Sequence, residues 1–249
     1  MAQSSLEQNS AEFEWKIDDV FGRIADRYDI LSDLFSLGIH RIWKQRVANR
    51  IASENWSSLI DGATGTGDII LRVLKTSNTN GRVIIASDVS NPMLAIAEQR
   101  LKRFKSEVRL WQLDAENMHC VVDSSVDAYS ISLGLKICNR HSVLKEAFRI
   151  LKPGGLLITL EASNIPWRPI HRAYLGYMAL CIPLLGWLAT GGDSSAYKYL
   201  LHGIREFPSA EVLAEELEEH GFEMVSFERL SLGIVAIHTA RKPKQGSDA

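Results

Sequence analysis

Residues 60–68 are Ile60-Asp61-Gly62-Ala63-Thr64-Gly65-Thr66-Gly67-Asp68, a glycine-rich turn between a β-rich run and a helical stretch. Glycine lets the backbone bend tightly and approach a ligand closely. The helix that follows has free backbone N–H groups at its start, and these favour polar or anionic ligands. The turn therefore predicts a cofactor site, although a simple tight turn would use the same residues.

Around this turn, strand-like and helix-like segments alternate. β-rich runs lie at 59–62, 83–87, 108–113, 126–133 and 156–160, and helical stretches include 91–105 and 140–151. This alternation predicts a parallel sheet with helices on both faces. Two later runs, Glu223–Leu230 and Ile234–Thr239, are close enough to form an antiparallel pair. We expect a doubly wound, Rossmann-like α/β fold with a mostly parallel seven-stranded sheet.

The chain of 249 residues fits one domain of this kind. Apolar residues recur at helical spacing from Glu12 to about Ile51, and a mostly helical insertion follows Pro166. We therefore expect an N-terminal helical cover (12–55), a cofactor-binding core (56–163), a helical lid insertion (164–207), and a last helix with the closing hairpin (208–241).

Three acidic residues lie at or near the ends of successive strands in this prediction. Asp61 closes the first strand, Asp88 follows the second, and Asp114 follows the third. The carboxyl ends of parallel strands form the ligand-binding edge of such sheets. Asp88 is placed to accept the two hydroxyls of a ribose, and Asp114 an adenine amino group.

A nicotinamide dehydrogenase is the main alternative for a glycine-rich turn followed by Asp88. Its fingerprint would start at Gly65 and require a small residue at Ile70. Isoleucine there would crowd the contact between helix and sheet. The third carboxylate and the closing hairpin also have no role in a dehydrogenase, so this alternative is disfavoured.

Composition excludes several other classes. The 28 basic and 30 acidic residues give a net charge of -2, so no global basic field recruits nucleic acid. The three cysteines are far apart, which argues against a zinc or disulfide framework, and no metal site is expected. The polar N-terminus does not resemble a secretory signal. We therefore expect a cytoplasmic protein, and we also consider peripheral contact with the inner membrane.

Several motifs resemble the UbiE family of ubiquinone/menaquinone biosynthesis C-methyltransferases over nearly the whole chain. The most diagnostic are the Gly-Ile-His-Arg-x-Trp-Lys run at 38–44 and the Tyr-x-Tyr-Leu segment at 197–200. The others are Val20-Phe21 to Asp29, Leu34–Leu37, Gly65–Asp68, Ile131–Leu135, Arg149–Gly155 and Ile204–Pro208.

The resemblance implies methyl transfer from S-adenosylmethionine to a ring carbon of a prenylated quinol, on the class I methyltransferase fold. It implies cofactor contacts at Thr66, Asp88, Asp114, Ala115 and Ser132. Together with the turn, the expected cofactor-binding set is Asp61, Gly65, Thr66, Gly67, Asp88, Val89, Asp114, Ala115 and Ser132.

The chain departs from the family pattern in three places. Thr64 replaces the first of two glycines, and Lys136 replaces an arginine thought to help handle the phenol proton. The segment 180–188 is also more apolar than the family pattern. These departures favour a second hypothesis, C-, O- or N-methylation of another lipophilic aromatic. A third is a cofactor-binding partner protein without activity.

Carbon methylation of a phenol requires removal of the hydroxyl proton and positioning of the ring behind the sulfonium methyl. The candidates for this chemistry are Lys136, Tyr28, Tyr197 and Arg205. Lys136 would stabilise a phenolate, or else be a solvated loop lysine. Tyr197 and its neighbour Tyr199 would equally serve ordinary packing.

The segment 173–190 is almost uncharged but is interrupted by Gly176, Pro183 and Gly186. We expect it to form a lid over an apolar substrate and to touch a membrane surface, rather than to span a bilayer. A homodimer contact, or ordinary core, is the other interpretation of the same residues.

Overall fold

The computed structural model describes residues 25, 28–104, 107–190 and 203–244. A seven-stranded sheet lies at its centre, with the order β3-β2-β1-β4-β5-β7-β6. Strands β1 to β5 are parallel, whereas β7 is antiparallel to both of its neighbours. The strands are β1 Ser58–Gly62, β2 Val83–Asp88, β3 Val108–Gln112, β4 Val126–Ser132, β5 Leu151–Ala162, β6 Glu223–Leu230 and β7 Val235–Arg241.

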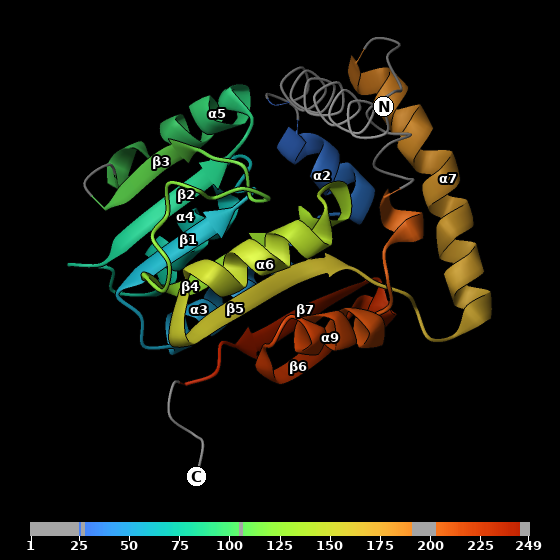
Figure 1. Cartoon of the computed structure of the whole chain (residues 1–249). Coiled ribbons are helices and arrows are strands. Elements are labelled where there is room, and N and C mark those ends of the chain that lie inside the picture. The colour runs from blue at the N-terminus through green and yellow to red at the C-terminus, as the bar shows by residue number, and fades with distance from the viewer. Residues whose placement is uncertain (1–24, 26–27, 105–106, 191–202, 245–249) are drawn as a thin grey trace, which may run out of the picture.

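Helices cover both faces of this sheet, so the predicted doubly wound fold is confirmed (Figure 1). Apolar residues of α3, α4 and α5 pack on one face, and those of α6 and α9 on the other. The helices are α2 Tyr28–Ser36, α3 His40–Ser53, α4 Asp68–Thr76, α5 Asn91–Leu101, α6 Arg140–Ile150, α7 Arg168–Thr190 and α9 Ala210–Glu219. Short 3-10 turns η2 Lys102–Phe104, η3 Leu135–Ile137 and η4 Ser231–Gly233 complete the described elements.

Residue chemistry explains where these helices begin. Ser90, Asn139 and Ser209 are the N-caps of α5, α6 and α9, and each side chain accepts a hydrogen bond from the first turn. The inner parallel strands β1, β2, β4 and β5 are mostly buried on both faces, as expected for a sheet covered on both sides, whereas the edge strand β3 is partly exposed. The core thus consists of two apolar layers separated by the sheet.

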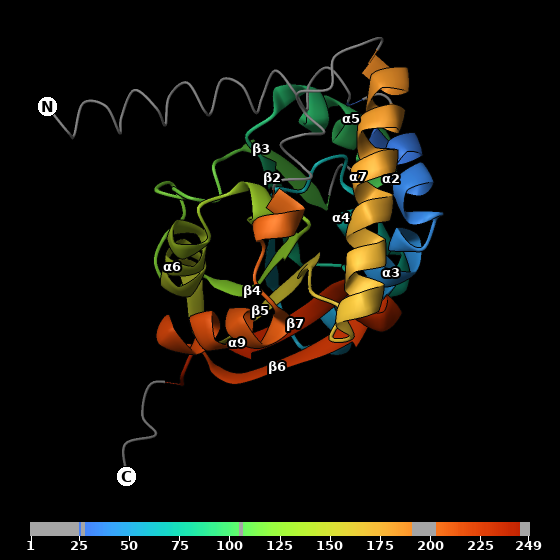
Figure 2. The same cartoon turned by 90° about the vertical axis from the view of Figure 1, so that its right-hand side faces the viewer.

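Helices α2 and α7 lie outside these layers, beyond the carboxyl ends of the parallel strands (Figures 1 and 2). They contact each other, so two segments far apart in sequence enclose the edge where the acidic residues were predicted. The boundaries expected for the helical cover and the lid insertion stay a prediction.

The structure differs from the sequence-based expectation in three details. Strand β5 begins at Leu151 rather than at 156, because residues 151–155 continue it after a register shift against β4. Strand β3 ends at Gln112, so Asp114 lies two residues beyond it. Helix α7 runs unbroken through Gly176, Pro183 and Gly186. Even so, no described helix has the length and apolar composition needed to cross a bilayer.

The Lys152–Gly155 segment at the start of β5 offers a direct test of this packing. A β-carbon added at Gly155 would lie 2.8 Å from the Lys152 carbonyl oxygen and 3.2 Å from that of Asp127. Backbone atoms cannot move aside cheaply, so Gly155→Ala should lower the free energy of unfolding by about 1–3 kcal/mol. Chemical denaturation measures this change.

Gly176→Ala is the matched control, because nothing lies within 4 Å of the added carbon and the residue is inside α7. This variant should be neutral or more stable by about 0.5–1 kcal/mol. Equal stability of the two variants would contradict the close packing at Gly155.

Candidate functional site

The glycine-rich turn has left-handed backbone at three residues. Ala63, Gly65 and Gly67 have φ values of 48°, 56° and 76°, and Gly67 is the N-cap of α4. Glycine adopts this region at little steric cost, which explains its presence at 65 and 67. The Thr64 N–H donates to the Ser87 carbonyl oxygen at 2.8 Å. The turn is therefore fastened to the end of β2.

Asp61 supports the turn from beneath. Its carboxylate is buried and accepts hydrogen bonds from the Thr64 hydroxyl and the Ser130 hydroxyl, both at 2.6 Å. Burial raises the pKa of Asp61 to about 6, although both hydrogen bonds act to lower it. Thr64 thus adds a bond that glycine at this position could not make. The role of Asp61 toward a cofactor stays a prediction.

Asp88 closes the turn from the side of β2. Its Oδ2 accepts a hydrogen bond from the Gly65 N–H at 2.8 Å, and its Oδ1 accepts one from the Ser90 N–H at 2.9 Å. The side chain is buried, whereas the neighbouring Val89 is 39% exposed. A carboxylate bordering a left-handed turn at a strand end is where a ribose would be held.

The segment after β3 lies next to Asp88. The Leu113 N–H donates to the Asp88 carbonyl oxygen at 3.1 Å, so the ends of β2 and β3 stay together. Asp114 follows, and its Oδ1 accepts a hydrogen bond from the Glu116 N–H at 2.8 Å. Ala115 is buried in the core layer beneath α6. Asp114 therefore heads a local turn at the predicted edge, two residues past the strand.

The end of β4 packs directly on the glycine-rich turn. A β-carbon at Gly134 would lie 2.8 Å from that of Ala63, so glycine is required for this approach. The Ser132 hydroxyl is buried without a hydrogen-bond partner in the described part of the chain. Buried polar groups normally have partners. An unsatisfied hydroxyl at this edge fits a ligand that supplies one, as expected of the cofactor.

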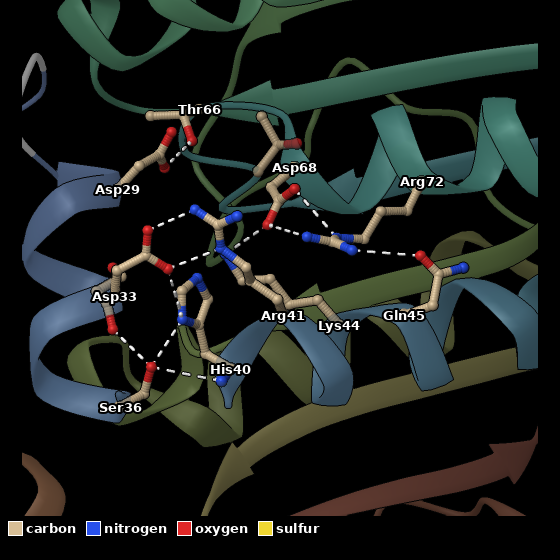
Figure 3. Close-up of polar contacts among 12 residues, drawn as sticks. Asp29, Asp33, Ser36, His40, Arg41, Lys44, Gln45, Thr66, Asp68 and Arg72 are labelled. Carbon is tan, nitrogen blue, oxygen red and sulfur yellow. Dashed lines mark hydrogen bonds and ion pairs between the residues drawn. The ribbon is translucent and has the colours of Figure 1, made fainter. Parts of the chain in front are cut away.

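The N-terminal cover is bonded to the same turn (Figure 3). The Thr66 hydroxyl contacts Asp29 of α2 at 3.1 Å. It also accepts a hydrogen bond from Arg100 of α5 at 3.0 Å. Arg100 also forms an ion pair with Asp29. Sequence reasoning missed Asp29 and Arg100, although Asp29 lies inside one of the resembling motifs. Thr66 thereby joins three elements at one point.

A second polar cluster holds α2 to the start of α3 (Figure 3). Asp33 accepts a hydrogen bond from Arg41 at 2.7 Å and lies 3.7 Å from His40. The Ser36 hydroxyl lies 2.7 Å from His40 Nδ1. Burial lowers the pKa of His40, and Lys44 contributes in the same direction, against the opposing effect of Asp33. His40 is therefore a structural residue at the helix start.

Helix α3 is joined to α4 by Asp68, which lies 3.1 Å from both Lys44 and Arg72. Burial acts to raise the pKa of Asp68, but the two cations outweigh it and the pKa lies below its ordinary value. This ion pair secures the first turn of α4, directly after the glycine-rich turn.

The structure describes three of the four predicted catalytic residues. Lys136 lies in η3 and is buried beside Glu161 of β5, 3.6 Å away, so its alternative as a solvated loop lysine is wrong. Arg205 is exposed on the helical turn 203–206, and a β-carbon at Gly203 would lie 2.8 Å from the Lys136 carbonyl oxygen. The insertion thus abuts η3. Tyr28 begins α2, whereas Tyr197 lies outside the described residues.

No group of three or more histidine, cysteine or acidic side chains in the described ranges could hold a metal ion. The organic cofactor expected from the sequence has a better-defined place. Its predicted contacts at Gly65, Asp88 and Ser132 come from the ends of β1, β2 and β4 at one edge of the sheet.

Comparison with known proteins relates this geometry to a family. Residues 8–242 match the model of the ubiE/COQ5 methyltransferase family. A mitochondrial 2-methoxy-6-polyprenyl-1,4-benzoquinol methylase from Schizosaccharomyces pombe is 37% identical, with 93% of this chain and 80% of that protein covered. A ubiquinone/menaquinone biosynthesis C-methyltransferase UbiE from Rickettsia prowazekii is also 37% identical, with 92% and 93% covered.

Among solved structures, a SAM-dependent methyltransferase from Thermotoga maritima, described as a possible histamine N-methyltransferase, superposes with a TM-score of 0.63. The superposition covers 90% of this chain and 99% of that one at 18% identity. At that identity the likeness concerns the fold alone.

The unfolding free energy of Asp61→Asn, relative to that of the wild type, should increase as the pH rises from about 4 to about 8. The pKa of Asp61 in the fold, about 6, lies above its ordinary value of 3.8. Its stabilising contribution is therefore complete below the ordinary value and is lost as the pH rises through the folded-state pKa. A gap of about two units corresponds to roughly 3 kcal/mol. Urea unfolding of both proteins across this range measures the trend, and a constant difference would contradict it.

Proposed function

Because the chain belongs to the ubiE/COQ5 methyltransferase family, we propose that it methylates a ring carbon of a prenylated benzoquinol. The family makes it an S-adenosylmethionine-dependent methyltransferase. The acceptor is proposed from the relatives, two of which are named for a polyprenyl benzoquinol and for ubiquinone/menaquinone biosynthesis. The observation that carries the proposal is the match over residues 8–242, which includes both the turn and the elements that enclose it.

The described residues fit the cofactor. S-adenosylmethionine supplies an electrophilic sulfonium methyl group when it is bound. The backbone of Gly65 to Gly67 would line its binding site, Asp88 would accept the ribose hydroxyls, and Asp114 would accept the adenine amino group. The Ser132 hydroxyl, buried and without a partner in the described part of the chain, supports this assignment.

On the acceptor side, the chain must hold the ring and remove its hydroxyl proton. Lys136 lies on the loop that packs against the turn through Gly134. An ammonium group there lowers the pKa of a neighbouring phenol by stabilising the phenolate. The turn 203–206, which abuts η3, would close this side and exclude water. Lys136 in place of the family's arginine also keeps a different lipophilic aromatic acceptor as the second candidate.

The purified protein should transfer a labelled methyl group from S-adenosylmethionine to a reduced prenylated benzoquinol, with the product identified by mass. Asp88→Ala removes a carboxylate that accepts two backbone hydrogen bonds and the predicted ribose contact. Hydrogen bonds to charged groups contribute about 1.5–3 kcal/mol each, so the Kd for the cofactor should rise at least 100-fold.

Asp123→Ala, at a carboxyl exposed on the surface, is the control and should bind the cofactor normally. Unchanged affinity in Asp88→Ala would refute the ribose contact. Methyl transfer to another phenol of a lipid extract, but not to the quinol, would favour the second acceptor class. Cofactor binding without transfer to either would favour a protein without activity.

A surface next to the site fits a membrane, where a prenylated substrate resides. The α2/α7 surface consists of exposed apolar residues on two contacting helices and in the turn that follows α2. These residues are Ile30, Leu34, Leu37, Tyr177 and Leu180. At the start of α7, Trp167 is 65% exposed and is followed by exposed Arg168 and Arg172. Aromatic and basic residues beside an apolar face are typical of a helix at a lipid surface.

We therefore propose that the α2/α7 surface touches an anionic bilayer and that the enzyme works at a membrane. The named S. pombe relative is mitochondrial, so the compartment expected from the sequence alone stays open. The homodimer contact expected for the same segment also stays a prediction.

Leu180→Glu should weaken binding to vesicles that contain anionic lipid. Leu180 is 72% exposed, and burying a leucine side chain contributes about 1.5–3 kcal/mol, so the partition coefficient should fall at least tenfold. Met224→Glu is the matched control, because Met224 is 77% exposed but lies on β6. Vesicle sedimentation measures both. Equal loss in the two variants, or none in Leu180→Glu, would contradict the proposed surface.

A further inference from the structure

The pair formed by Lys136 and Glu161 is the most deeply buried ion pair of the described residues. Their side chains are 5% and 0% exposed, and Lys136 Nζ lies 3.6 Å from Glu161 Oε2. Lys136 Nζ also donates to the Leu133 carbonyl oxygen. The other carboxylate oxygen of Glu161 accepts a hydrogen bond from the Leu135 N–H at 2.6 Å. The carboxylate is therefore fixed against η3.

One oxygen of this carboxylate has spare capacity. Oε2 of Glu161 has no hydrogen-bond partner within the described ranges, although a buried carboxylate ordinarily has several. An ammonium has three donors, and the hydrogen bond to the Leu133 carbonyl oxygen occupies one of those on Lys136. The pair thus has a donor left on the cation and an acceptor left on the anion.

Such a pair is costly to bury. Removing two charges from water costs several kcal/mol per ion, and apolar residues of similar volume often serve stability as well or better. A pair retained beside the cofactor edge therefore indicates a chemical role. Glu161 is not among the residues that sequence reasoning placed in the site.

The protein environment brings the pKa values of Lys136 and Glu161 closer together, which favours exchange of a proton between them. Burial lowers the pKa of Lys136 and raises that of Glu161, while each opposes the shift of the other. The other groups that act on the pair are Lys44 of α3, Cys138 and Arg140 of α6. The two partners are thus brought closer in basicity than a free lysine and a free glutamate.

We propose that Glu161 stores the phenol proton during methyl transfer and that Lys136 passes it there. This inference rests on the proposed phenolic acceptor. Lys136 touches the substrate oxygen, whereas Glu161 acts through Lys136 and is a positioning and proton-storing residue.

The step balances as follows. The Lys136 ammonium gives a proton to the Glu161 carboxylate and takes the proton of the phenol, so the substrate becomes a phenolate beside an ammonium. The ring carbon then forms its bond to the methyl group as the bond from methyl to sulfur breaks. The methylated ring loses its C–H proton to water, and the proton held on Glu161 returns through Lys136 to the oxygen. One proton is released per methyl group transferred.

The first test is a double-mutant cycle in the methyl-transfer assay. General acid–base catalysis contributes about 10²–10⁴-fold in rate, so Glu161→Gln should lower kcat at least 100-fold with unchanged cofactor affinity. Lys136→Met should have a similar effect. Because Glu161 acts through Lys136, the double variant should be no slower than Lys136→Met alone. Independent effects that multiply would overturn the proposal.

The double variant also guards against misfolding, because it removes both charges and keeps their volumes. Thermal unfolding of all three variants monitors the fold. Glu161→Gln with kcat within threefold of wild type would overturn the proposal.

The pH profile supplies a readout that a structural role would not move. If Glu161 is already protonated before the substrate binds, its carboxylate cannot accept the phenol proton. The kcat/KM should therefore fall at low pH. Because burial raises the pKa of Glu161, this limb should lie closer to neutral than for an exposed glutamate. It should disappear in Glu161→Gln and persist in Asp123→Ala, whose carboxyl is exposed on the surface outside the site. An acid limb that persists in Glu161→Gln would contradict the storage role.

A binding experiment separates this inference from the proposed acceptor. The probe is 4-nitrophenol at a pH low enough that the free probe is the neutral phenol. The wild-type protein should bind it as the coloured phenolate without releasing a proton to the medium, because Glu161 keeps it. Glu161→Gln should release one proton for each phenolate bound, measured by calorimetry in buffers of different ionisation enthalpy. Equal release by both proteins, or a probe left as neutral phenol by the wild type, would overturn the inference. If the wild-type protein retains the proton but methylates no quinol, the proposed acceptor is refuted and the storage role of Glu161 is not.

Discussion

The hydrogen bond from the Gly65 N–H to the Asp88 carboxylate fixes the left-handed turn on which the rest of the site depends. With Asp61 bonded to Thr64 on the other side, the turn is held by two buried carboxylates. Once it is fixed, Gly134 can pack against Ala63, and Thr66 can anchor α2 and α5. The strand ends, the cover and the loop with Lys136 thus all derive their positions from one bend of the backbone.

The sequence predicted the parts of this arrangement that depend on local pattern. The alternation of strand-like and helix-like segments gave the sheet, and the short gap before Val235 gave the closing hairpin. Asp88 was found because a carboxylate follows directly after a buried β-rich run. Such signals are local: they need only the period of apolar residues and the known edge at which parallel strands end.

What the sequence did not reveal depends on contacts between distant residues. Asp29 and Arg100 are 71 positions apart, and neither has a pattern that would identify the other. Lys136 was noticed as a departure from a motif, but its partner Glu161 lies within an apolar strand where nothing marks a charge as paired. The unbroken course of α7 through Pro183 was missed as well, because proline is usually a sign that a helix ends or kinks.

The replacement of arginine by lysine at 136 takes a different meaning once Glu161 is seen beside it. On sequence grounds the change weakened the quinol assignment, because the resemblance gives the family's arginine a part in handling the phenol proton. A buried lysine shifts its pKa readily, and one that faces a buried carboxylate can exchange a proton with it. An arginine, which stays charged, stabilises a phenolate, whereas the lysine and glutamate together can also hold the proton that the phenolate has lost. The departure therefore supports proton handling at this position.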